Sequence, residues 1–475
     1  MDALSDAYGA TGQFIEFAWW RWEKVNITIG FAQLNLCKPF SFTIIKKRLM
    51  PNTGIGYITT NAFNQSTEQF SLPTDESVCG LLFDLTFFQN PFDDYPLIQQ
   101  FFGNEKTQVI NNLTEAAMYG LMDNQFMNGV PYYHIKAFYD YIGADAPLYI
   151  CFTSDGQEWS AVEQMQMSTN GKIFQIGVWT AQCIWNVSGT QIGFTDLYSN
   201  LENAAEELTG KVGTSTMGIS PLSLVVSPNT SISKTSVELQ EIPSAIELNS
   251  PKLSICLFQN GTDDVHVMQN KNPFNAPVGC IGLLMACLYS AYAEECIGHV
   301  DKFNLNKNDD FENAEIYFGG KYISVDEITY LVGNYVAQRG YIMPCIYSGK
   351  EAEVFFSGDP TLSDGDYNTI ANNRIMHKCR RCVHSALLPY INANHLLDTT
   401  SGGLSETAKT ILTSAITSTL DSIMKNPKGQ SQIDGRTIEI SDSTDILQTD
   451  TISISLSIGL VNYNKVINEQ DDYEV

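Results

Sequence analysis

The chain has 475 residues, 44% of them hydrophobic, which is enough apolar material for about three domains or one elaborated domain. Its formal net charge of −26 argues against nucleic acid as the main partner, because phosphates carry the same sign. Charged residues make up only 17% of the chain, so its surface must be built largely from uncharged polar side chains. Such a surface suits packing against other protein, since burying it leaves few charges unpaired.

Eleven cysteines are scattered along the chain, and several lie inside apolar runs. We interpret them as reduced, buried side chains of a protein made in a reducing cytosol. The first ten residues lack the basic and apolar regions of a signal peptide. The best membrane-span candidate, residues 276–293, is uncharged but barely long enough, and a buried core helix is the favoured interpretation.

Residues 1–75 form an irregular N-terminal region that we interpret as an arm. Apolar residues alternate over 25–31, which predicts a strand. Trp19, Trp20 and Trp22 lie close together in the sequence and favour either a local core or an interface anchor.

Residues 76–365 alternate between apolar runs and amphipathic segments. The apolar runs predict buried strands over 78–88, 146–154, 172–181, 221–228 and 252–261. Helices are expected over 95–103, 111–126, 130–143, 160–169 and 196–212, and again from Pro277. Short connections between these segments are typical of an α/β fold, a mostly parallel sheet covered by helices, with a possible outer subdomain. Further strands are expected over 314–323 and 343–361, and a helix over 324–340 that is capped by Ser324 and Glu327.

Residues 366–475 read as a separate α+β domain, which we call the C-terminal unit. Long helices are expected within 367–391 and 398–426, followed by a strand within 429–441. The closing strand alternates apolar and small residues, with Ile452, Ile454, Leu456, Ile458 and Leu460 on one face. An acidic tail follows it. A half-apolar strand at a chain end needs a partner, because chain ends are usually loose and polar.

The common nucleotide-binding, nucleophile-elbow and metalloprotease motifs are missing from the sequence, which contains only six histidines. Cys379 and Cys382 lie between His377 and His384, but no second ligand pair follows, and on a helix the two thiols share one face. Packed cysteines are therefore favoured over a zinc or redox site.

Two other groups of charged residues tempt a functional interpretation. Glu295 and His299 are interpreted as a surface pair rather than as catalytic groups. Asp93 and Asp94 fit a solvated turn or a helix cap better than a cation site. The sequence thus predicts no catalytic residue, no metal site and no cofactor.

One basic stretch stands out in the acidic chain. Arg374, Lys378 and Arg381 fall along one face of the helix expected there, and no acid occurs from Tyr367 to Leu397. Two interpretations remain open: an internal ion-pairing face, or a docking face for an acidic partner.

The order of these elements resembles the sheath proteins of contractile phage tails. The likeness rests on residues 132–181, on the apolar helix that follows Pro277, Val278 and Gly279, and on the helix pair and strands of 373–467. It extends over residues 78–467 and looks closest to sheaths of Bacteroides-type prophages. Sheaths of contractile injection systems share the fold.

The resemblance implies a non-enzymatic structural subunit that polymerises helically around an inner tail tube. Contraction releases stored conformational energy and drives the tube through the target envelope. Each subunit lends a terminal strand to its neighbour, here the strand formed by Ile452, Ile454, Leu456, Ile458 and Leu460.

The implied partners are further copies of the chain, the tube protein, and baseplate and terminator proteins, without nucleic acid or direct membrane insertion. The implied location is a virion tail assembled in the host cytoplasm. Arg374, Lys378 and Arg381 become candidate charges for docking the tube. The alternatives are an injection-system sheath, another tail component, or, less favoured, an α/β enzyme.

Overall fold

The computed structural model describes residues 40–45, 75–122, 125–188, 191–208, 221–231, 241–307, 311, 313–328, 336–391, 393–398, 402–441 and 451–461. The predictions for residues 25–31, for Trp19, Trp20 and Trp22, for residues 329–335 and for the acidic tail lie outside these residues. The helix expected over 324–340 begins with α8 (Val325–Glu327), and the Ser324 hydroxyl caps it as predicted by accepting from the Glu327 amide.

A seven-stranded sheet forms the centre of the core, in the order β13-β9-β8-β5-β2-β4-β3. Its strands are β2 (Cys79–Asp84), β3 (Gln108–Ile110), β4 (Leu148–Thr153), β5 (Gln175–Cys183), β8 (Ser223–Asn229), β9 (Leu253–Cys256) and β13 (Tyr341–Ile342). All neighbours pair in parallel except β3, which runs antiparallel to β4 at one edge. The mostly parallel sheet predicted from the apolar runs is therefore confirmed.

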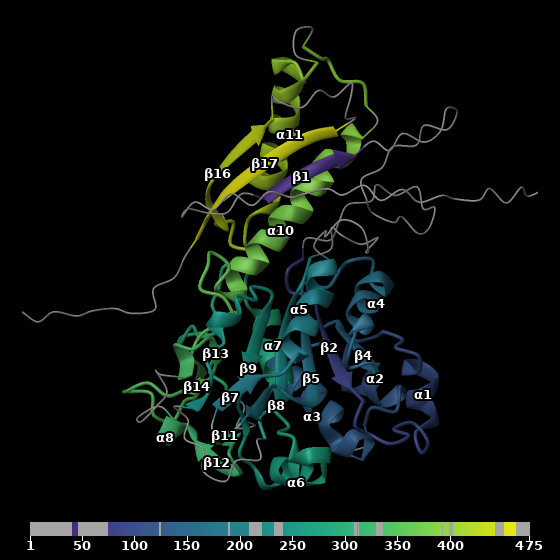
Figure 1. Ribbon diagram of the computed structural model, residues 1–475, viewed down its shortest axis with the longest axis vertical. Helices are drawn as coiled ribbons and strands as arrows, with labels where there is room; N and C mark the ends of the chain where they lie inside the picture. Colours follow the sequence, from purple (N-terminus) through teal and green to yellow (C-terminus); the bar gives the residue numbers. More distant parts are fainter. Residues whose placement is uncertain are drawn as a thin grey trace, which may run out of the picture.

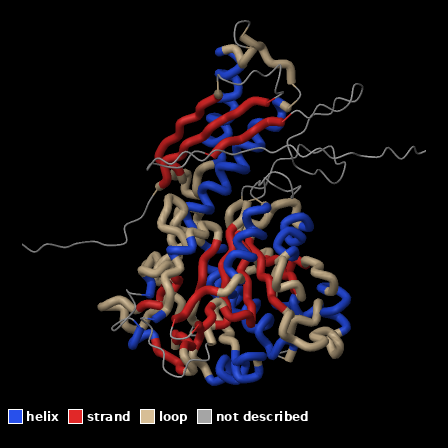
Figure 2. Tube along the Cα trace, viewed as in Figure 1, coloured by secondary structure: helices blue, strands red, loops and turns tan. Residues whose placement is uncertain are grey.

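Helices cover both faces of this sheet (Figures 1 and 2). On one face, α7 (Ile281–Ser290) packs on β5 and β2, and α3 (Val130–Ile142) packs on α7. On the other face, α4 (Ser160–Ser168) packs on β4, and α5 (Leu197–Glu207) packs on β8. The smaller helices α1 (Pro96–Phe102), α2 (Leu113–Met118) and α6 (Asp263–Lys271) lie around the sheet's periphery (Figure 1).

The uncharged segment that begins at Ala276 contributes a helix of only 10 residues, α7, whose residues are almost all buried. Within the described residues, no helix is both long and apolar enough to cross a membrane. The expectation of a core helix is therefore confirmed.

Short strands complete the core. They form the small sheet β10 (Gln259–Asn260), β11 (Ala314–Phe318) and β12 (Lys321–Ser324), and the pairs β6 (Trp185–Ser188) with β7 (Gln191–Phe194) and β14 (Pro344–Cys345) with β15 (Phe355–Phe356). The single strand expected over 314–323 is in fact a hairpin. Gly319 and Gly320 have φ of 58° and 77°, a left-handed backbone that turns the chain between β11 and β12.

The C-terminal unit stands at one end of the core (Figure 1). Its helices are α10 (Ile370–Leu387) and α11 (Glu406–Ile423), capped by the Thr369 and Ser405 hydroxyls. Its three-stranded sheet has the order β1-β17-β16, with β1 (Phe40–Ile45), β16 (Ile433–Ile440) and β17 (Thr451–Leu460). The buried apolar residues of the described chain fall into two clusters, one around the seven-stranded sheet and one between α10, α11 and this smaller sheet.

Candidate assembly site: the C-terminal sheet and its junction with the core

Strand β17 has one buried and one partly exposed face, as its alternating sequence predicts. Ile452, Ile454, Leu456 and Ile458 are at most 6% exposed, and Leu460 is partly buried against the same cluster. The intervening serines are only partly covered. The predicted apolar face therefore packs on α10 and α11 of its own chain.

Strand β17 is the central strand of its sheet. It pairs antiparallel with β16 over Ile433–Ile440 on one side and with β1 on the other, where Ser41 lies opposite Ser455. Strand β1 comes from the N-terminal region and was not predicted. Since β1 and β16 each pair with β17 alone among the described strands, both are edge strands of this sheet.

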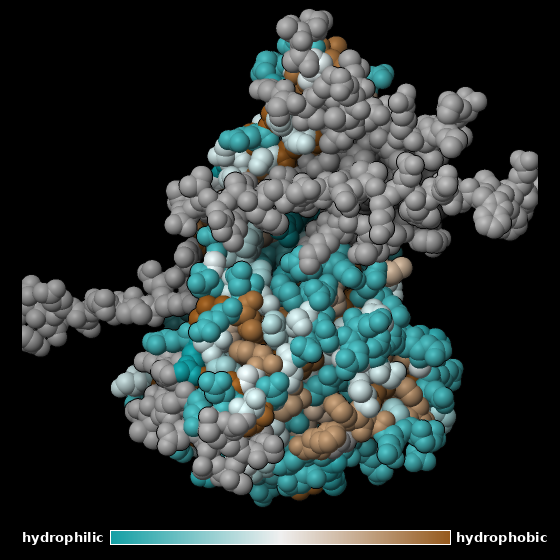
Figure 3. Space-filling view, in the orientation of Figure 1, coloured by the Kyte–Doolittle hydropathy of each residue, from teal (hydrophilic) through white to brown (hydrophobic). Residues whose placement is uncertain are grey.

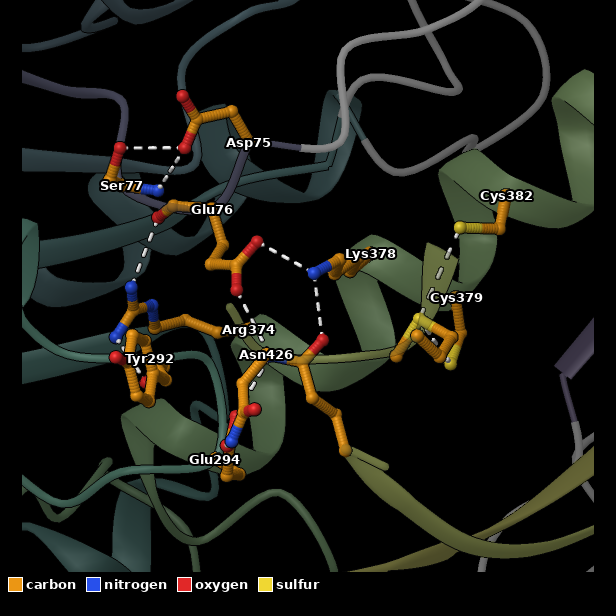
Figure 4. A network of polar contacts seen from close by, with 12 residues as sticks. Asp75, Glu76, Ser77, Tyr292, Glu294, Arg374, Lys378, Cys379, Cys382 and Asn426 are labelled. Carbon is orange, nitrogen blue, oxygen red and sulfur yellow. Dashed lines mark hydrogen bonds and ion pairs between the residues drawn. The ribbon is translucent and has the colours of Figure 1, made fainter. Parts of the chain in front are cut away.

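A polar cluster joins the C-terminal unit to the core (Figure 4). Lys378 of α10 donates to Glu76, which precedes β2, and to Gln432, which precedes β16, over 2.7 Å in each case. Gln432 in turn donates to Glu76 and to Glu294, at 2.9 and 2.8 Å. Asn426, which follows α11, donates to Glu294 at 2.8 Å. The cluster thus ties three segments of the C-terminal unit to two segments of the core.

Glu76 is the acid that neutralises Lys378. Burial alone raises the pKa of Glu76, but the charge of Lys378 and the hydrogen bonds from Lys378 and Gln432 outweigh it, so that the pKa lies below its ordinary value. The pair is nearly buried, with side-chain exposures of 5% for Lys378 and 12% for Glu76. Glu76 escaped notice in the sequence because it lies about 300 residues from Lys378.

Arg374 and Arg381 are fully buried, and Lys378 is 4% exposed. The two arginines donate to main-chain carbonyls of the core: Arg374 to four, among them Ala291, and Arg381 to three, among them Ile173. As placed, none of the three cations reaches a surface where a tube protein could bind. Their burial argues against the docking interpretation. The internal ion-pairing interpretation fits Lys378, which pairs with Glu76, whereas the two arginines are held by main-chain carbonyls.

The two thiols of the C-x-x-C stretch pack against a methionine. The sulfurs of Cys379 and Cys382 lie 3.8 and 4.0 Å from the Met424 sulfur, in the buried cluster under the small sheet. Burial raises the pKa of Cys382 to about 12, so its thiol stays protonated. The described residues contain no group of three or more potential metal ligands. Packed cysteines are therefore what the structure supports.

The remaining charged candidates have ordinary surroundings. Glu295 pairs with Lys302 instead of with His299, which is exposed. Asp93 and Asp94 are exposed in a turn, and helix α1 begins after Tyr95 without a side-chain cap. The solvated-turn interpretation agrees with this placement, whereas the helix-cap interpretation does not.

The carboxyl ends of parallel strands are where α/β enzymes usually bind their ligands. There, Asp84 ends β2 and is 1% exposed. Its carboxylate accepts hydrogen bonds from Thr180 at 2.7 Å, from Gln182 at 2.9 Å and from Thr86. A Cβ on Gly156 would lie 2.1 Å from the Gln182 amide nitrogen, so the backbone closes over these side chains. Asp84 is thus a structural group held by its neighbours. Two of them, Thr180 and Gln182, lie 96 and 98 residues away, too distant in sequence to be predicted.

Comparison with known proteins adds three findings. A family model described as the C-terminal domain of DUF2586 matches residues 366–469. Among curated proteins, nothing matches.

Two solved structures are similar over most of the chain. One is a chain in the six-fold symmetrised cryo-EM structure of the anti-feeding prophage baseplate. The identity is 9%, the TM-score is 0.47, and the match covers 90% of the present chain and 100% of the baseplate chain. The second is the helical sheath of the same prophage in its contracted state, with 10% identity, a TM-score of 0.47, and coverage of 88% and 100%.

Proposed function

We propose that this chain is a structural subunit of a contractile tail sheath. Copies would polymerise helically around an inner tail tube and, on contraction, drive the tube through a target envelope. The energy for contraction would be conformational energy that is stored when the sheath assembles. The sheath of an extracellular injection system would work in the same way.

The observation that carries this proposal is the position of β17 between β16 and β1. A three-stranded sheet made from both ends of one chain is suited to strand exchange, because the slot beside β17 accepts a β1 strand from any copy with the same register. Exchange reproduces the same main-chain hydrogen bonds between β1 and β17, so it requires no new type of contact between copies.

The length of the connection allows β1 to come from a neighbour. Twenty-nine residues, 46–74, separate β1 from the first described residue of the core. A chain of that length spans at most about 100 Å when fully extended. This reach exceeds the size of a single small domain, so a strand can be donated to an adjacent copy while the body stays in place.

Strand pairing also fits the charge of the chain. Copies with a net charge of −26 repel one another, and strand pairing supplies main-chain hydrogen bonds that do not depend on charge. An exchanged β1 occupies the same edge position beside β17, so exchange links two copies without adding a strand to the sheet.

The proposal is tested by a mixing experiment with two variants, each of which adds one cysteine to the natural eleven. Ser41→Cys is made in one preparation and Ser455→Cys in another, since these positions are partners across β1 and β17. The two are mixed, allowed to assemble, oxidised, and run on a non-reducing gel. Strand exchange predicts a covalent dimer of the two variants, and electron microscopy of the same sample should show striated tubes.

The matched control replaces Ser455→Cys with Ser453→Cys, whose partner is Thr43, so the cross-link should be much weaker. A second control compares truncation after Asp450, which removes β17, with truncation after Val461, which removes only the tail. Tubes should be lost in the first and kept in the second. Monodisperse particles without any mixed dimer would overturn the proposal.

A further inference from the structure

Helix α10 supplies capping groups that the core lacks. Helix α7 ends at Ser290, and the last carbonyls of a helix have no partner within it. Arg374 donates to the carbonyls of Leu288, Ala291 and Tyr292, at 3.1, 2.9 and 3.1 Å. Its positive charge also lies at the negative end of the α7 dipole. The central helix of the core is therefore capped by a side chain of the C-terminal unit.

Arg381 likewise donates to main-chain carbonyls of the core, here at the amino-terminal edge of the parallel sheet. It donates to the carbonyls of Ile173 at 2.8 Å and Pro221 at 3.0 Å, just ahead of β5 and β8, and also to that of Gly171. Its guanidinium lies 3.9 Å from the centre of the Phe174 ring. A planar group with several donors suits this position, because it reaches three carbonyls at once.

Both arginines are charged groups that are fully buried when the chain is folded. Burial lowers the pKa of Arg381 to about 9, which still leaves it protonated at neutral pH. A buried cation that loses its partners is strongly destabilising. Since those partners are carbonyls fixed by folded core elements, α10 cannot keep its place if the core around β5, β8 and α7 opens.

We propose that the core and the C-terminal unit fold and unfold as one cooperative unit, coupled through Arg374 and Arg381, although a family model delimits residues 366–469 as a domain. The consequence rests on the function proposed above: the sheet that exchanges strands is presented only by a chain whose core is complete. A chain whose core has not yet folded then presents no ordered slot beside β17. This limits pairing of its strands with other copies before folding is complete.

Hydrogen exchange on the full-length, unassembled chain tests the coupling. Leu456→Ala removes a fully buried side chain from β17 without touching the core sheet. If the unit is cooperative, the slowest amides of β5 and β8 should exchange faster by the same factor as those of β17, about 100-fold or more. In an Arg374→Met and Arg381→Met background, the effect of Leu456→Ala should become confined to the C-terminal unit.

Two matched controls accompany the test. Ser455→Ala changes the other face of β17 and should leave the β5 and β8 amides unchanged. Arg380→Met removes the same charge from the same helix, at a position that is only partly buried, and should leave the coupling intact. If the double arginine variant does not fold, hydrogen exchange of Leu456→Ala in the otherwise natural chain still tests whether the core and the C-terminal unit are coupled. Faster exchange restricted to β16, β17 and α11 would overturn the inference, and this result is independent of whether tubes form.

Discussion

Glu76 shows how one side chain can fix the geometry of a junction. It leads into β2 from the N-terminal region, its carboxylate binds Lys378 and Gln432, and its carbonyl accepts from Arg374 at 3.1 Å. Two of the three contacts come from α10 and the third from the residue that precedes β16. Glu76 therefore fixes the point where the N-terminal region enters the body.

This pair should make stability depend on pH. Because the pKa of Glu76 is depressed in the folded chain, its contribution is present above the ordinary glutamate pKa and is lost as pH falls through the lowered value. Glu76→Gln should lower the free energy of unfolding by roughly 1–3 kcal/mol at pH 7. Denaturant titrations at pH 7 and pH 3.5 check this, and the difference between the two chains should be smaller at the lower pH. An equal difference at both pH values would contradict the assignment.

At the scale of elements, helices α3 and α7 approach each other closely. A Cβ on Gly282 would lie 2.1 Å from the carbonyl oxygen of His134. The His134 ring is also held against the start of α7 by a 2.9 Å contact with the Val278 carbonyl. Burial lowers the pKa of His134 to about 3, so the ring stays neutral and fits this apolar crossing.

Gly282→Ala should therefore push the two helices apart. We expect a loss of about 1–3 kcal/mol in the free energy of unfolding, as for overpacking in other cores. Thermal and denaturant unfolding measure the loss. Gly435→Ala is the matched control, since a Cβ there meets nothing within 4 Å, and it should be close to neutral. Equal stability of the Gly282 variant and the natural chain would mean that the helices are not packed this closely.

At the scale of the whole molecule, two properties have opposite effects on association between copies. The low share of charged residues favours association, whereas the net negative charge opposes it. Where Figure 3 colours the core, its surface is mostly hydrophilic and carries apolar patches. Charged residues are few, at 17%, but the chain still carries a net −26. Assembly of like-charged copies must therefore overcome repulsion that is long-ranged at low salt.

Salt should consequently promote assembly of this chain. Raising NaCl from 0.01 to 0.15 M shortens the Debye length from about 30 to about 8 Å, which screens repulsion between copies but leaves strand pairing intact. Light scattering and sedimentation should show faster and more complete tube formation at the higher salt. Sodium sulfate at equal ionic strength controls for chloride binding. Tubes that dissolve with added salt would indicate that ion pairs between copies, and not strands, hold them.

The sequence by itself determined the elements whose pattern is local. The runs around Cys79–Asp84 and Leu148–Thr153 are mostly apolar because both faces of a parallel sheet are covered. The alternation from Ile452 to Leu460 fixed the buried face of β17, since side chains of a strand point to alternate sides. Period and composition are enough for such inferences.

Only the tertiary structure decided what these elements meet. The spacing of Arg374, Lys378 and Arg381 placed them on one helix face but could not say whether that face looks outward or inward. Their partners, such as Glu76 and the Ile173 carbonyl, lie some 200 to 300 residues away in the chain. The pairing of β1 with β17 is equally remote. Long-range contacts of this kind depend on how the whole chain packs, and main-chain carbonyls leave no signature in the residue types.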